Sequence, residues 1–136
     1  MIDREVINEY DLGLPVPMPP LEERICRVPD AVWRCLRRAK EALTALLGTR
    51  LAELKLFGSY ARAQFVEDSD VDVLVLLADE PTTSERNAIL HACFEASRGD
   101  WEVVLSPLIM SQAELDDLRA RERILALDID REGIPL

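Results

Sequence analysis

The chain has 136 residues, of which 49% are hydrophobic, which suits one domain with a modest core and excludes a large two-domain enzyme. Its formal net charge of −10 disfavours extended binding to DNA or RNA, because a phosphate backbone is bound by surfaces rich in lysine and arginine. The sequence shows neither a signal peptide nor an apolar run long enough to cross a membrane, so we expect a cytoplasmic protein.

Residues 1–28 are predicted to form a proline-rich N-terminal arm ahead of a domain at residues 29–136. Four of the eight prolines fall within residues 14–21. Proline fixes φ and lacks an amide hydrogen, so this stretch is expected to be extended, as polyproline II, rather than helical. The composition leaves open whether the arm is a disordered leader or packs on the domain or on a partner.

The first predicted elements of the domain are a helix and two strands. A helix is predicted over residues 29–47, because Pro29 suits a first turn, apolar residues follow at helical spacing, and Gly48 suits a C-cap. Strands are predicted over residues 51–57 and 71–77. The second strand is apolar on both faces apart from Asp72, which indicates deep burial.

The rest of the chain predicts two helical regions around a third strand. A capping-box pattern at residues 82–85 begins a helix that Gly99 closes. Residues 101–105 are predicted to be the third strand. A second capping box, at residues 111–114, begins a helical region that ends before Gly133. This order predicts an α/β (α+β) fold with a small mixed sheet and helices packed on one face.

The junction of the first two strands is the most informative feature for function. The first strand ends in Gly58-Ser59, and backbone amides and a hydroxyl at the start of a helical turn suit a phosphate. Asp70 and Asp72 open the next strand and share one face, because side chains alternate along a strand. Two carboxylates opposite a phosphate cradle can hold Mg²⁺ against a nucleotide, so the pattern indicates nucleotidyl transfer.

Simpler interpretations of these residues stay open. A Gly-Ser pair is commonly only a turn, and Asp-x-Asp is common on acidic surfaces. Asp72 favours a site, because a carboxylate in a strand built for burial is costly without a metal or a cationic partner. Arg62 either contacts a phosphate in bidentate fashion or forms a salt bridge with the carboxylates. Glu102 is either part of the site or an exposed strand residue.

The segment Phe57-Gly58-Ser59-Tyr60-Ala61-Arg62, followed by Asp70-Val71-Asp72, resembles the signature of the DNA polymerase β-like nucleotidyltransferase superfamily. Within it the chain resembles the minimal nucleotidyltransferases, whose usual ending is similar to residues 130–136. The resemblance covers about residues 29–136. It implies the polymerase β-like nucleotidyltransferase fold, with Mg²⁺ or Mn²⁺ as the cofactor and ATP as the co-substrate.

The resemblance also implies roles for particular residues. Gly58, Ser59 and Arg62 would bind the nucleotide. Asp70, Asp72 and Glu102 would be the catalytic and metal-binding carboxylates.

A protein partner is implied as well. Minimal nucleotidyltransferases are often the antitoxin paired with a HEPN ribonuclease toxin, and some silence that toxin by adenylylating a tyrosine. The chain is too short for a substantial acceptor-binding domain, which favours a protein acceptor in a homo- or hetero-oligomer. Ala63 stands where the group usually has glycine, and Glu102 where it more often has aspartate. These departures favour the alternative, a weakly active or inactive binding module that neutralises its partner by contact.

Overall fold

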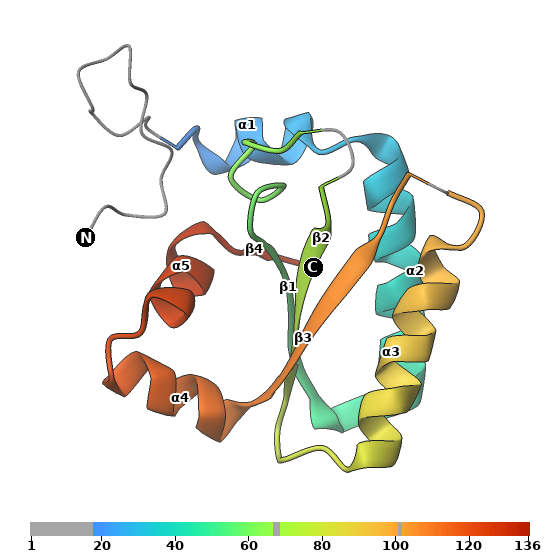
Figure 1. The fold of residues 1–136 in the computed structure, drawn as a ribbon, viewed down its shortest axis with the longest axis vertical. Coiled ribbons are helices and arrows are strands. Elements are labelled where there is room, and N and C mark those ends of the chain that lie inside the picture. The colour runs from blue at the N-terminus through green and yellow to red at the C-terminus, as the bar shows by residue number, and fades with distance from the viewer. Residues whose placement is uncertain (1–17, 67–68, 101) are drawn as a thin grey trace.

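The computed structural model describes residues 18–66, 69–100 and 102–136. Within them the chain forms a sheet of four strands in the order β3-β2-β1-β4 (Figure 1). The strands are β1 (Leu51–Phe57), β2 (Val71–Leu77), β3 (Leu105–Ser111) and β4 (Ile134–Pro135). β1 runs antiparallel to β2 and to β4, whereas β2 and β3 are parallel. The predicted fold class, with a small mixed sheet, is confirmed.

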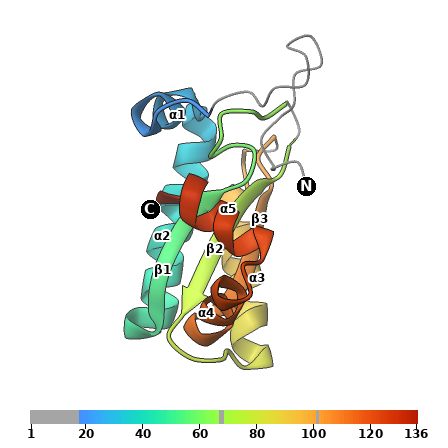
Figure 2. The same cartoon turned by 90° about the vertical axis from the view of Figure 1, so that its left-hand side faces the viewer.

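Helices cover both faces of the sheet, which corrects the prediction of helices on one face. α2 (Asp30–Leu47) and α3 (Thr83–Ser97) lie on one side, and α4 (Gln112–Ala120) and α5 (Ile124–Glu132) on the other (Figures 1 and 2). The reason lies in β2. Its valines belong to the core under α2 and α3, and Leu74 and Leu76 belong to the core under α4 and α5. A strand that is apolar on both faces needs cover on both.

The predicted helix boundaries in the domain are largely confirmed. Pro29 precedes α2, and Gly48 is its C-cap at φ +54°. α3 and α4 both begin with a complete capping box, in which the N-cap hydroxyl and the glutamate three residues later bond each other's backbone amide. α5 ends directly before Gly133. A short 3-10 turn (Gly48–Arg50) leads from α2 into β1.

The third strand was predicted in the wrong place. β3 begins at Leu105, and residues 102–104 belong to the connection that precedes it, while Trp101 lies outside the described residues. β3 is an edge strand, and an edge is where a strand tolerates proline. Pro107 in its middle therefore does not prevent pairing, although it interrupts the sequence pattern of a strand.

Part of the predicted arm is helical. α1 (Leu21–Arg27) begins after Pro20 and packs on the domain beside the segment that joins β1 to β2 (Figure 1). Half of the stretch predicted to be polyproline II, residues 14–17, lies outside the described part of the chain. Residues 18–20 are neither helix nor strand, and Pro20 is extended at φ −56° and ψ 154°, whereas Leu21 already belongs to α1. No helix in the described part combines the length and the apolar character that a bilayer crossing requires.

Candidate functional site

The end of β1 and the start of β2 meet where the sequence places the candidate site. Phe57 pairs with Asp72, and Gly58 follows at φ +77°. A Cβ atom at position 58 would lie 2.2 Å from Asp72 Oδ2. Glycine is therefore required both by the backbone conformation and by the approach of the carboxylate. The Asp72 carboxylate rests against the backbone of the turn that follows β1.

The turn itself presents backbone amides. Three hydrogen bonds close residues 58–64, donated by the amides of residues 62–64 to the carbonyls of residues 58–60 at 2.9–3.2 Å. The amides of Ser59 and Ala61 have no acceptor within the described part of the chain. Amides at the start of such a turn form an anion-binding concavity. This geometry agrees with a phosphate cradle at Gly58-Ser59.

Ala63 adopts a left-handed conformation, with φ +59°. A positive φ is the conformation for which glycine is favoured, so alanine is a strained choice at this position. The alanine methyl group makes such a conformation cost about 1–2 kcal/mol. On either side of Ala63 the rings of Tyr60 and Phe65 stack with centroids 4.2 Å apart, which fixes the ends of the strained segment.

A pocket of about 390 Å³ lies against this turn. It contains three of the predicted site residues and adds residues from α5 that sequence reasoning missed. Its lining consists of Phe57, Gly58, Arg62, Asp72, Ile124, Leu125, Asp128 and Glu132. Asp128 and Glu132 are both buried and one helical turn apart on α5. The sequence did carry a signal for this part of the pocket, because two acidic residues stand at this spacing on a helix face that is otherwise apolar.

Arg62 forms a buried ion pair with Glu132. Its Nη1 donates to Glu132 Oε1 at 3.0 Å, and the two side chains are 11% and 2% exposed. Burial raises the pKa of Glu132, while the Arg62 charge and hydrogen bond oppose that rise. Arg62 thus forms a salt bridge, but its partner is Glu132 and not the carboxylates Asp70 and Asp72 that the sequence suggested. Within the described residues, Arg62 Nε and Glu132 Oε2 have no hydrogen-bond partner.

The structure does not bring the three predicted carboxylates together. Asp70 is exposed directly before β2, and Glu102 is exposed before β3. The residue of β3 that pairs with Asp72 is Ser106, so Glu102 lies four residues too early. Among the residues that the structure describes, no group of three or more His, Cys, Asp or Glu side chains is placed to hold a metal ion. The misplaced third strand explains why Glu102 lies before β3 instead of beside Asp72.

Asp70 and Asp72 nevertheless fit a metal that a nucleotide helps to bind. Mg²⁺ prefers oxygen ligands, keeps several waters, and is commonly bound by one or two carboxylates together with substrate phosphates. Because Gly58 has no Cβ, Asp72 Oδ2 lies close to the backbone of the turn. The amides of that turn are the groups that would bind those phosphates. The donor types present are those that such a site requires.

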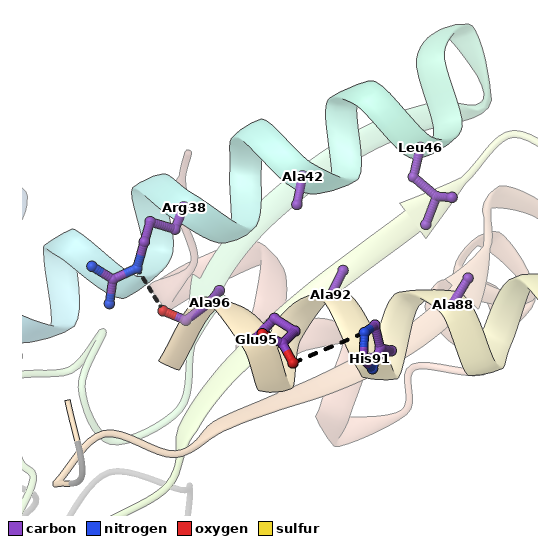
Figure 3. Close-up of a pocket in the computed structure, with 8 residues that line it drawn as sticks. All are labelled: Arg38, Ala42, Leu46, Ala88, His91, Ala92, Glu95 and Ala96. Carbon is purple, nitrogen blue, oxygen red and sulfur yellow. Dashed lines mark hydrogen bonds and ion pairs between the residues drawn. The ribbon is translucent and has the colours of Figure 1, made fainter. Parts of the chain in front are cut away.

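A larger hollow, of about 490 Å³, lies between α2 and α3. Figure 3 shows its lining, in which Arg38 donates to the Ala96 carbonyl at 2.8 Å and His91 lies 4.0 Å from Glu95. Most of the other lining residues are alanines. The hollow contains none of the predicted site residues, so the smaller pocket beside Gly58 is the candidate site.

Known proteins resemble the part of the chain that contains Gly58 and Asp72. The family model of the nucleotidyltransferase domain covers residues 36–125. A protein of Methanocaldococcus jannaschii, provisionally named a protein adenylyltransferase, is 35% identical over 74 residues, which make up 54% of this chain and 74% of the relative.

Two solved structures are more distant. A provisionally named nucleotidyltransferase from Sulfolobus solfataricus is 20% identical, with a TM-score of 0.42, over 79% of this chain and 86% of its own. A toxin–antitoxin structure with AMP-PNP is 24% identical, with a TM-score of 0.46, over 71% of this chain and 68% of its own. Both TM-scores lie below 0.5, and we base nothing on these two likenesses.

The contact between Gly58 and Asp72 predicts energetic coupling. Gly58→Ala should lower the free energy of unfolding by about 1–2 kcal/mol through its φ and by about 1–3 kcal/mol more through overlap with Asp72. In an Asp72→Ala background the overlap cost should largely disappear, giving a coupling energy of about 0.5–3 kcal/mol in a urea-unfolding double-mutant cycle. Gly99→Ala is the control, because Gly99 has φ +96° and no atom near the added Cβ. Additive costs at positions 58 and 72 would show that the contact is absent.

The left-handed conformation of Ala63 predicts a stabilising substitution. Ala63→Gly should raise the free energy of unfolding by up to about 1 kcal/mol, because relief of the steric strain exceeds the entropy that glycine loses. Ala42→Gly, at an exposed position in α2, should lower it by about 1 kcal/mol. Both are measured by denaturant unfolding. Equal losses for the two variants would contradict a strained residue 63.

Proposed function

The chain belongs to the nucleotidyltransferase domain family, and on that premise we propose that it transfers AMP from ATP to a hydroxyl group of a partner protein. The observation that carries the proposal is the placement of Asp72 against the Gly58 backbone, beside a turn with available amides. The archaeal relative, provisionally named a protein adenylyltransferase, supports a protein acceptor. The choice of ATP and of a hydroxyl acceptor follows from the resemblance to minimal nucleotidyltransferases.

In the proposed step the acceptor oxygen forms a bond to the α-phosphorus of ATP. The bond from that phosphorus to the oxygen of the β-phosphate breaks, pyrophosphate leaves with the bonding electrons, and the hydroxyl proton is released. The turn at residues 58–61 would bind the phosphates through its amides and the Ser59 hydroxyl. Positioning and charge neutralisation supply most of the catalysis in such reactions.

Asp70 and Asp72 would hold Mg²⁺ or Mn²⁺, which when bound neutralises the triphosphate and orients it. We do not include Glu102 in this pair, because Ser106 rather than Glu102 lies beside Asp72. Arg62 lines the pocket but is engaged by Glu132. We therefore assign Arg62 to holding the turn and balancing charge at the pocket, instead of the direct nucleotide contact that the resemblance implies.

The partner we propose is a HEPN-type toxin, modified on a tyrosine, with this chain as the antitoxin. This choice rests on the resemblance to minimal nucleotidyltransferases. The net charge of −10 agrees with a partner that presents a basic surface. The site is then expected to act in a complex between the two proteins.

A second candidate function is a binding module that blocks the partner without modifying it. The strained Ala63 and the lack of a cluster of three carboxylates among the described residues favour this alternative. It uses the same surface as the enzyme and differs only in whether AMP is transferred. The two candidates therefore predict different products from the same mixture.

Metal-dependent nucleotide binding tests the role of Asp72. ATP with Mg²⁺ should raise the melting temperature, because a ligand at one hundred times its Kd stabilises the folded state by about 2.7 kcal/mol. Asp72→Asn should remove this increment in a thermal-shift titration. Asp117→Asn, on the exposed side of α4, changes the charge equally and should keep it. An Asp72→Asn variant that responds to ATP like wild type would exclude the assignment.

Mass spectrometry distinguishes the enzyme from the binding module. With Mg²⁺, ATP and the HEPN-type protein expected from a neighbouring gene, the chain should add one AMP to a tyrosine of that protein. Asp70→Asn combined with Asp72→Asn should prevent the addition, and Ala63→Gly should raise its rate by up to about tenfold for each 1.4 kcal/mol of strain relieved. If the doubly substituted chain still neutralises the partner fully, and no NTP gives an adduct, inhibition is by contact.

A further inference from the structure

We propose that α1 is part of the nucleotide site, and that Arg24 is a positioning residue that holds the turn at residues 58–64 in its binding shape. The inference rests on the proposed function, in which this turn binds the phosphates. It concerns two segments outside residues 36–125, which the nucleotidyltransferase family model matches. One of them is α1, and the other is the C-terminal end of α5.

Arg24 joins three parts of the chain that are distant in sequence. Its Nη1 donates to the carbonyl of Ala61 at 3.0 Å and to the carbonyl of Glu132 at 2.8 Å. Its Nε donates to the carbonyl of Pro19 at 2.9 Å. The residue is only 6% exposed. A planar guanidinium with several fixed donors suits such bridging, whereas a lysine ammonium is a single point of charge.

Glu132 continues this connection to the same turn. Its carbonyl accepts from Arg24, and its carboxylate accepts from Arg62 at 3.0 Å. The turn is therefore held at two adjacent residues, at the Ala61 carbonyl by Arg24 and at the Arg62 side chain by Glu132. We call Arg24, Arg62 and Glu132 the clasp.

The attachment of α1 depends mainly on Arg24. Arg24 is the buried residue of this helix, whereas Leu21 and Ile25 are exposed. The described contacts include one other bond to α1, from Trp33 Nε1 to the Ile25 carbonyl at 3.3 Å. Val28, the C-cap, is buried in the core and anchors the end of α1, but within the helix itself apolar burial does not explain why α1 lies where it does. Hydrogen bonds of a buried charge to backbone carbonyls explain it better.

The strained Ala63 gives the clasp a role in the site. A non-glycine residue at φ +59° persists only where its surroundings fix the backbone, because the relaxed conformation is lower in energy. Ala61 and Arg62 directly precede it, and both are held by the clasp. Alanine makes this left-handed conformation costly, and the clasp supplies the constraint that keeps the turn in it.

Hydrogen exchange and nucleotide affinity test this inference in the full chain. Arg24→Ala should speed amide exchange at residues 62–64 at least tenfold, leave exchange in α3 unchanged, and weaken binding of ATP with Mg²⁺ at least tenfold, which corresponds to 1.4 kcal/mol. Arg27→Ala is the matched control on the same helix. Its pair with Glu23 is solvent-exposed, with side chains 53% and 48% exposed, so both readouts should stay at wild-type values.

Arg24→Lys keeps the charge and should give an intermediate effect on both readouts, which also preserves the test if the alanine variant does not fold. Unchanged exchange at residues 62–64 would overturn the inference. Exchange that rises equally in α3 would also overturn it, because Arg24 would then act only on global stability. Faster amide exchange in the turn together with wild-type affinity for ATP would overturn the positioning role. If the wild-type chain binds no ATP, the proposed function fails, and selective exchange at residues 62–64 still decides whether Arg24 holds the turn.

Discussion

The approach of the Asp72 carboxylate to the backbone of Gly58 is the contact on which the rest of the site depends. It exists because β1 and β2 pair in a register that sets Phe57 opposite Asp72. A shift of one residue would turn Asp72 toward the apolar core under α2 and α3, and the cost of burying that carboxylate opposes such a shift. The same constraint directs Asp72 toward the face covered by α4 and α5, where the pocket lies.

The second requirement is that the charged side chains buried beside the Gly58–Asp72 contact are paired or hydrogen-bonded. Arg24, Arg62 and Glu132 would each be costly alone, and breaking a buried pair costs about 3–5 kcal/mol. Burial lowers the pKa of Arg24 and raises the pKa of Glu132, and in each case the opposite charge counteracts the shift. Their value to the protein is geometric, since they join both ends of the described chain to the turn that follows β1.

The sequence predicted those features whose causes are local. Prediction needed no knowledge of distant contacts for the capping boxes at Thr82 and Ser111 or for the apolar strand at residues 71–77. β3 was misplaced because its partner strand and its position at the sheet edge, which make Pro107 acceptable, are tertiary facts. For the same reason Glu102, which was expected on that strand, lies before it. The carbonyl of Glu132 meets Arg24 across 108 residues of sequence, so no local pattern indicated it. Cover on both sheet faces, however, was predictable from the two apolar faces of β2.

Paramagnetic broadening by Mn²⁺ tests the central claim most directly. In an amide NMR spectrum of the chain with a non-hydrolysable ATP analogue, substoichiometric Mn²⁺ should broaden the signals of residues 58–61 and 70–72 first. Signals from the hollow between α2 and α3, such as those of Ala42 and Ala92, should stay sharp. Broadening centred anywhere other than the junction of β1 and β2, or no nucleotide-dependent broadening, would contradict a metal and nucleotide site built on Gly58 and Asp72.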